Sequence, residues 1–177
     1  MATQPSFEHA MTVEEYLSTV FEHDCELVDG EVVERAMGEF EHSFLQGILV
    51  TVFNTHRVKW GLICLPEQRV NTRPGRYRVP DLVILKSDAP RERVLTHPPM
   101  LIIEILSPED TLRRATQKVI EYCEFGVENV WVIDPSARVA YLGSKTGIEL
   151  THTRMLTING TPIQINLDEL FAELDKI

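Results

Sequence analysis

Two acidic residues lie inside apolar segments of this sequence, and a lysine follows them. Glu104 lies in MLIIEILSP, where every other residue as far as Leu106 is apolar, and Asp81 lies in RVPDLVIL. A buried ionised carboxylate is costly unless a cation compensates its charge. Two such acids can hold a divalent cation, and Lys118, in an expected helix, can face a phosphate. This order of Asp, Glu and Lys is what a metal-dependent phosphodiesterase requires.

The expected metal is Mg²⁺, with Mn²⁺ as a substitute, because a hard cation that keeps several waters needs few protein oxygens. Asp81 and Glu104 are the predicted ligands, with the carbonyl of Ile105 as a third. Lys118 is expected to neutralise the phosphate or orient the water, since acting as a general base would require a strongly lowered pKa. Changing either acid to its amide is expected to abolish cleavage and to leave the fold intact or more stable, because repulsion between the carboxylates is relieved.

Each residue also has a purely structural alternative. Asp81 after Pro80 can simply begin a strand, an edge strand can expose Glu104, and Lys118 alone fits a solvated helix face. For His42, a capping or core histidine is favoured over a catalytic one. Found together and in this order, Asp81, Glu104 and Lys118 favour the catalytic interpretation.

Length, charge and cysteine content limit the class of protein. We expect one domain over residues 1–177, long enough to bury a core without disulfides. Seventeen Lys plus Arg against 27 Asp plus Glu give a formal net charge of -10. This charge argues against nonspecific coating of nucleic acid or an anionic membrane, but it allows a local basic groove. The three scattered cysteines predict buried free thiols, and the absence of a leader pattern or a membrane-spanning run predicts a cytoplasmic protein.

Turn residues and apolar spacing predict a mixed α/β fold. Thr12 and Glu15 can form a capping box, and Asp29-Gly30 predicts a hairpin over 25–34 in which Glu26 and Glu31 share a face. The remaining elements are expected as helices at 42–60 and about 110–125, strands at 63–70, 77–85 and 101–106, a strand-turn-strand over 130–143, a hairpin at Asn159-Gly160, and a closing helix capped by Asn166.

Four arginines precede Asp81 with no acid between the first and the last: Arg69, Arg73, Arg76 and Arg78. On a hairpin beside the active site they are expected to bind nucleic-acid phosphates. The alternative is a solvated hairpin whose arginines pair with surface acids.

Three segments, RVPDLVIL, LIIEILSPED and QKVIEYCEFGVENVWVIDP, together with CELVDGEVVE and His42, resemble the Uma-type family of restriction endonucleases, a branch of the PD-(D/E)XK nuclease superfamily. The resemblance spans nearly the whole domain. It implies a restriction-endonuclease-like core, a mixed β-sheet flanked by helices with additional hairpins, and Mg²⁺ held by the acids that match Asp81 and Glu104.

The resemblance also assigns the lysine and a further acid. The superfamily's usual lysine position is Leu106 here, whereas in this branch the lysine lies on the next helix, where Lys118 matches it. Glu31 matches another active-site position, with Glu26 beside it. Members often carry an acid about one helical turn before the lysine, where this chain has Arg113, Arg114 and Ala115.

The sequence therefore predicts a Mg²⁺-dependent endonuclease acting on double-stranded DNA, with Glu31, Asp81, Glu104 and Lys118 as catalytic residues. A noncatalytic module that binds protein or nucleic acid is the main alternative, favoured by the acidic balance and the missing helix acid. Hydrolysis of a smaller phosphodiester is a third.

Cleavage of both strands by a domain with one active site needs two copies, so we expect a homodimer. The closing helix carries an apolar stripe, which its own core or a partner must cover: Leu167, Leu170, Phe171 and Leu174.

Overall fold

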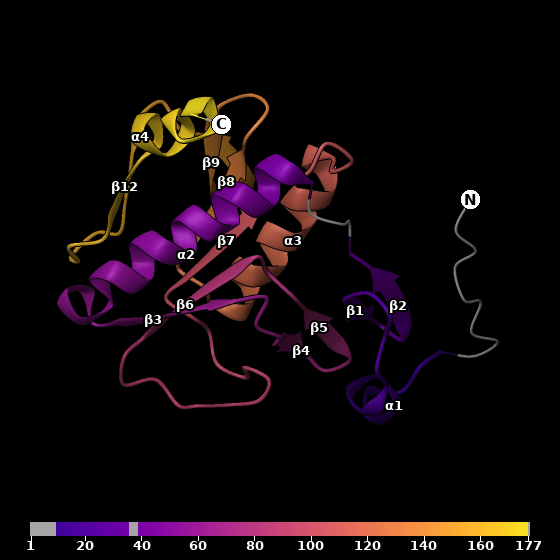
Figure 1. Ribbon diagram of the computed structural model, residues 1–177. Helices are drawn as coiled ribbons and strands as arrows, with labels where there is room; N and C mark the ends of the chain where they lie inside the picture. The colour runs from indigo at the N-terminus through magenta and orange to yellow at the C-terminus, as the bar shows by residue number, and fades with distance from the viewer. Residues whose placement is uncertain (1–9, 36–38, 177) are drawn as a thin grey trace.

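The computed structural model describes residues 10–35 and 39–176, and two β-sheets dominate it (Figure 1). The larger sheet has six strands in the order β10-β9-β8-β7-β6-β3, with β7 and β8 parallel and the other neighbours antiparallel. Its strands are β3 (Leu62–Pro66), β6 (Leu82–Lys86), β7 (Leu101–Ile105), β8 (Asn129–Asp134), β9 (Val139–Ser144) and β10 (Gly147–Leu150).

The smaller sheet is antiparallel, with four strands in the order β2-β1-β5-β4. Its strands are β1 (Cys25–Val28), β2 (Glu31–Glu34), β4 (Val70–Arg73) and β5 (Arg76–Arg78). A separate hairpin joins β11 (Met155–Thr157) to β12 (Gln164–Asn166). The helices are α1 (Val13–Ser18), α2 (Phe40–Trp60), α3 (Leu112–Phe125), α4 (Leu167–Ala172) and the 3₁₀ turn η1 (Leu174–Lys176).

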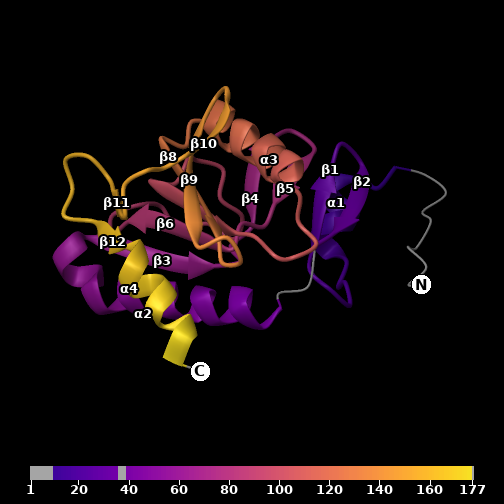
Figure 2. The same cartoon turned by 90° about the horizontal axis from the view of Figure 1, so that it is seen from above.

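Helices cover both faces of the six-stranded sheet, with α2 and α4 on one side and α3 on the other (Figure 2). The alternation along each strand explains these layers. On β6 and β7, Leu82, Ile84 and Ile103 pack with α2, whereas Val83 and Ile102 pack with α3. The result is the mixed α/β fold with a flanked mixed sheet that the sequence predicts.

Local signals set the ends of several elements. Thr12 and Glu15 form the capping box of α1, and Gly126 ends α3 with a φ of 112°, which a glycine adopts without strain. The Asp29-Gly30 turn joins β1 to β2 in the expected register, with Glu26 opposite Val33. The hairpin at 159–160 and the Asn166 cap of α4 are also present.

Two predicted strands were wrong in extent, because each is divided between the two sheets. The segment 77–85 forms the end of β5 and most of β6, and the segment 63–70 forms β3 and the first residue of β4. Pro80 has no N–H to donate, so the ladder cannot continue through it. In the other segment Glu67 has a φ of 53°, which turns the chain out of β3.

The closing apolar stripe belongs to the protein's own core. Leu167, Leu170, Phe171 and Leu174 are all buried against the α2 side of the sheet. This stripe therefore gives no support to dimerisation. The cysteines Cys25, Cys64 and Cys123 are buried free thiols, as expected. Within the described ranges, none of the helices has the length and apolar character needed to cross a membrane.

A glycine on β9 lets α3 lie close to the sheet. A Cβ added to Gly143 would lie 2.5 Å from Val119 Cγ1 and 2.9 Å from Val130 Cβ. Val119 is next to Lys118 in α3, so this contact also keeps the helix that carries the lysine close to β9.

We expect Gly143→Ala to lower Tm, because the new methyl group overlaps the α3 contact and costs about 1–3 kcal/mol. Gly47→Ala on α2 is the matched control, since its Cβ meets nothing within 4 Å and alanine favours a helix. Thermal unfolding of both variants checks this. Equal Tm values would contradict the close packing of α3 on β9.

Candidate active site

The candidate site lies where the two sheets separate, at the end of β7. Because Leu82 pairs with Ile103, the next antiparallel pair outward places Asp81 beside Glu104. Both carboxylates are almost fully buried, with Asp81 3% and Glu104 6% exposed. They line a small pocket of about 40 Å³, whose other lining residues are Glu26, Arg35, His42, Ile105, Leu106, Ser107, Asp110, Arg114, Ala115 and Lys118.

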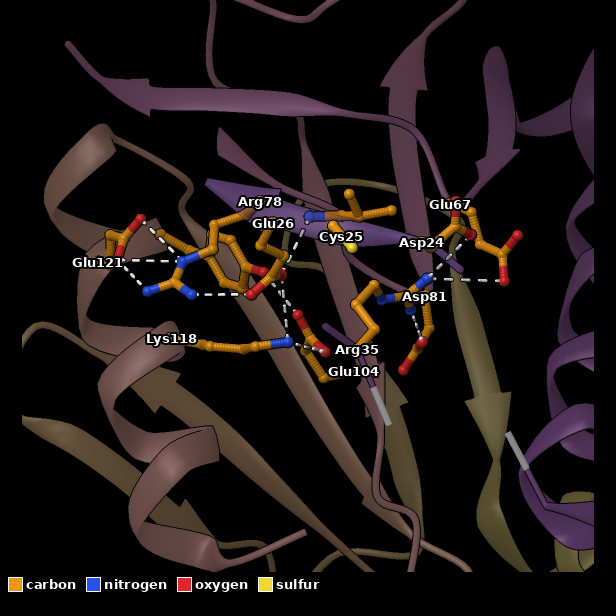
Figure 3. Close-up of polar contacts among 12 residues, drawn as sticks. Asp24, Cys25, Glu26, Arg35, Glu67, Arg78, Asp81, Glu104, Lys118 and Glu121 are labelled. Carbon is orange, nitrogen blue, oxygen red and sulfur yellow. Dashed lines mark hydrogen bonds and ion pairs between the residues drawn. The ribbon is translucent and has the colours of Figure 1, made fainter. Parts of the chain in front are cut away.

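An arginine, a histidine and a backbone donor surround Asp81. Arg35 Nη2 donates to Oδ1 at 2.6 Å, His42 Nε2 lies 3.2 Å from Oδ2, and the Ile105 N–H donates to Oδ2 at 2.7 Å. Arg35 Nη1 also lies 3.7 Å from a carboxylate oxygen of Glu67. Figure 3 shows these two side chains pointing toward each other. Asp81 therefore has a fixed orientation and a compensated charge.

Lys118 and Tyr122 hold Glu104 from the same face of α3, four residues apart. The Tyr122 hydroxyl donates to Glu104 Oε1 at 2.6 Å, and Lys118 Nζ lies 3.6 Å from Oε2. Lys118 Nζ also lies 3.3 Å from Glu26 Oε1 on β1, so the ammonium sits between two carboxylates (Figure 3).

A second ion cluster, between β5 and α3, holds Glu26 in place. Arg78 Nη1 donates to Glu26 Oε2 at 2.8 Å, and Arg78 Nη2 donates to Glu121 Oε2 at 2.7 Å. The N–H of Val79 donates to Glu26 Oε1 at 3.1 Å. Arg76 and the Thr72 hydroxyl also donate to Glu121. These contacts fasten the smaller sheet to α3.

The pKa values of Asp81 and Glu26 are lowered by their neighbours. Burial raises the pKa of Asp81, but the hydrogen bond and charge of His42, with the Arg35 charge, bring it below its usual value. Burial likewise raises the pKa of Glu26, and the charges of Lys118 and Arg78 outweigh this effect. Both groups are carboxylates at neutral pH.

Glu104 differs from these two acids. Burial raises its pKa to about 7, with Lys118 acting against burial and Asp81 acting with it. Burial lowers the pKa of Lys118, but Glu104 and Glu26 more than compensate, so its net pKa is raised. Lys118 is therefore a cation at neutral pH, which disfavours a role as general base.

The donor set fits a hard cation that keeps most of its waters. Asp81 and Glu104 offer two adjacent carboxylates, and the backbone of Ile105 lies in the same pocket. Among the described residues there is no cluster of three His, Cys, Asp or Glu side chains arranged to hold a metal. Two carboxylates with retained waters suit Mg²⁺, whereas zinc takes more protein ligands.

The structure brings together most of the predicted site. Asp81, Glu104, Ile105 and Lys118 all line the pocket. Glu31 does not: it is exposed beside the turn at the start of β2, although it shares a face of the hairpin with Glu26. Glu26, buried further along that face, is the hairpin acid that reaches Lys118.

The four hairpin arginines already have partners within the chain. Arg78 is buried between Glu26 and Glu121, Arg73 and Arg76 both contact Asp29, and Arg69 lies over the ring of Tyr16 at 4.8 Å. This arrangement agrees in part with the ion-paired alternative: Arg73, Arg76 and Arg78 pair with acids, whereas Arg69 contacts an aromatic ring. The Arg78 pairs are buried, whereas the alternative placed the acids at the surface.

Three residues that were not predicted from the sequence as part of the site contact Asp81 or Glu104. His42 contacts Asp81, Tyr122 donates to Glu104, and Arg35 makes the shortest contact with Asp81, at 2.6 Å. The spacing of Lys118 and Tyr122 could have indicated Tyr122, because residues four apart share a helix face. No local signal distinguishes Arg35, since its contact with Asp81 spans 46 residues.

The raised pKa of Glu104 predicts how the stability of the metal-free protein depends on pH. A carboxyl whose folded pKa lies above its unfolded value stabilises the fold fully below the unfolded pKa, and loses that contribution as pH rises through the folded pKa of about 7. Glu104→Gln should therefore gain Tm relative to wild type between pH 5 and pH 8, by about 3 °C or more. Thermal unfolding in EDTA measures this gain.

Glu149→Gln, an exposed change on β10, controls for the loss of one charge and should show no such trend. A difference between Glu104→Gln and wild type that stays constant with pH would contradict the raised pKa.

Comparison with solved structures identifies the fold. A putative nuclease belonging to DUF820 from Anabaena variabilis ATCC 29413 superposes with a TM-score of 0.81, over 93% of this chain and 99% of that chain, at 22% identity. A DrdV-DNA complex matches 73% of this chain and 10% of that chain, at 14% identity and a TM-score of 0.43, which is too low to carry an argument.

No curated protein matches the chain. The model of the Uma2 family, described as "Putative restriction endonuclease", matches residues 13–172. This match takes in both sheets and every residue of the pocket. The chain therefore belongs to the Uma2 family.

Proposed function

We propose that this protein is a Mg²⁺-dependent endonuclease that hydrolyses phosphodiester bonds of double-stranded DNA. The observation that carries the proposal is the pair of buried carboxylates, Asp81 just before β6 and Glu104 on the adjacent strand β7, with the Lys118 ammonium 3.6 Å from Glu104. Family membership and the fold shared with a putative nuclease support it. Bound between Asp81 and Glu104, Mg²⁺ would neutralise phosphate charge and supply an activated water.

The chain's own residues would orient the reacting groups. Lys118, a cation at neutral pH, is placed to attract a phosphate oxygen or to orient the attacking water. Glu26 restrains the Lys118 ammonium at 3.3 Å, and Tyr122 fixes one oxygen of Glu104. Such preorganised charges act strongly at a site that largely excludes water.

Asp81→Asn and Glu104→Gln should both abolish cleavage of plasmid DNA, because each removes a candidate metal ligand. Their stabilities should differ. Asp81→Asn removes the negative charge shared by Arg35 and His42 and should cost about 3 kcal/mol, whereas Glu104→Gln should not destabilise the metal-free protein. For Asp81→Asn this prediction differs from the one based on sequence, because Arg35 and His42 contact its carboxylate. Urea unfolding in EDTA measures both variants.

The matched control for these variants is Glu149→Gln, which should cleave at the wild-type rate. Retained cleavage by Asp81→Asn or Glu104→Gln would contradict the proposal.

The same plasmid assay also tests the expected homodimer. A homodimer with one site for each strand should linearise the plasmid, whereas an isolated subunit should only nick it.

Lys118→Met should reduce the single-turnover rate about 100-fold without weakening metal binding. Removing the ammonium leaves Glu26 and Glu104 with less compensation, which favours a bound cation. Calorimetric Mg²⁺ titration and quenched-flow cleavage separate the two effects, with the exposed Lys86→Met as the control. A wild-type rate in Lys118→Met would remove the lysine from the reaction.

A noncatalytic binding module is the second candidate. The observation that favours it is the full engagement of Asp81 by Arg35, His42 and the Ile105 N–H, which a metal would have to displace in part. A module of this kind would show no Mg²⁺ binding above that of Glu104→Gln in calorimetry, and no cleavage.

A further inference from the structure

Arg114 lies at the edge of the candidate active site, on the first turn of α3. It lines the same pocket as Asp81 and Glu104, and it precedes Lys118 by four residues. Residues at this spacing lie on the same helix face, so the two cationic side chains project toward the same pocket. Unlike Lys118, Arg114 is exposed to solvent.

The guanidinium of Arg114 has no carboxylate partner among the described residues. Its backbone N–H donates to the Thr111 hydroxyl at 3.2 Å, and the first turn of α3 contains no acid. Asp110 also lines the pocket, but its Oδ2 accepts from the N–H of Ser107 at 2.9 Å. Arg114 is therefore free to bind an anion that enters the pocket.

The charges of the pocket favour such a role. The described residues that line the pocket include His42, four acidic side chains and three lysine or arginine side chains. Arg35 is paired with Asp81 and Lys118 lies between Glu26 and Glu104, so the charge of Arg114 is the uncompensated one of the three. The carboxylates of the pocket repel an incoming phosphate. A cation without an acidic partner can offset this repulsion.

The hairpin arginines are poorly suited to this task. Arg76 and Arg78 are held by Glu121, and Arg73 donates to Asp29 at 2.9 Å. Releasing Arg78 would leave the buried carboxylates of Glu26 and Glu121 with one cationic partner each instead of two, which is costly. Arg114 can bind a phosphate without breaking any ion pair.

We propose that Arg114 is the phosphate-binding residue of this active site, and that its guanidinium holds the scissile phosphate of the DNA strand or the phosphate next to it. This inference rests on the proposed nuclease function. A planar guanidinium can donate two parallel hydrogen bonds to phosphate oxygens, which gives orientation as well as charge. Arg114 would then hold the substrate while Lys118 acts at the reacting centre.

The test compares Arg114→Ala with Arg113→Ala. Arg113 is the matched control because it has the same charge and exposure one residue away, but it does not line the pocket. Anisotropy with a fluorescent DNA duplex in EDTA, over a series of salt concentrations, measures binding. Single-turnover cleavage at saturating DNA and Mg²⁺ measures the chemical step.

Arg114→Ala should lower the single-turnover rate about 100-fold and reduce the salt slope of binding by roughly one unit. Arg113→Ala should stay within about twofold of the wild-type rate, because loss of a remote charge affects encounter more than chemistry. Arg114→Lys should recover part of the rate, since it keeps the charge but not the paired donors. A change in fold alone would not produce this recovery.

The outcomes separate the two proposals. If wild-type protein cleaves DNA and Arg114→Ala behaves like Arg113→Ala, the role of Arg114 is overturned and the nuclease function stands. If wild-type protein neither binds nor cleaves DNA, the nuclease function fails, and the assignment of Arg114 fails with it.

Discussion

The structure depends on the compensation of buried carboxylates. Asp81, Glu104 and Glu26 are almost fully removed from solvent, and a half-compensated set would cost several kcal/mol. Their cationic partners come from distant parts of the chain: Arg35 follows β2, Arg78 ends β5 and Lys118 lies on α3. The charge balance therefore fixes the position of the smaller sheet relative to the larger one and to α3.

The separation of the two sheets creates the pocket. Chain segments that begin in one sheet end in the other, with Pro80 and Glu67 at the two crossings, and the N–H of Glu67 donates to the Asp81 carbonyl at 3.2 Å. Asp81 thus lies just outside the regular ladder, next to Glu104. A carboxylate in the middle of a strand of this sheet would be covered by α3 or α2. At the crossing it can be reached from the pocket.

Much of the architecture could be predicted because it depends on local signals. The capping box at Thr12, the turn at Asp29-Gly30 and the glycine after α3 each act within a few residues. Pro80 marks the break in the strand over 77–85, because it has no N–H to donate, but the sheet that each half joins could not be predicted. Sequence pattern shows whether a segment is extended, but it does not show which sheet the segment joins.

The candidate site likewise combines residues that could be identified from the sequence with residues that could not. Asp81, Glu104 and Lys118 could be identified because an acid in an apolar run needs a cation. Arg35 and Arg78 could not, since their pairing spans 46 and 52 residues. The overall charge of -10 is equally uninformative about the pocket. At physiological ionic strength exposed charges are screened beyond about 8 Å, so the nearby groups decide whether a phosphate can approach. An acidic protein can therefore have a pocket suited to an anion, provided that a cation with no acidic partner among the described residues faces that pocket, as Arg114 does here.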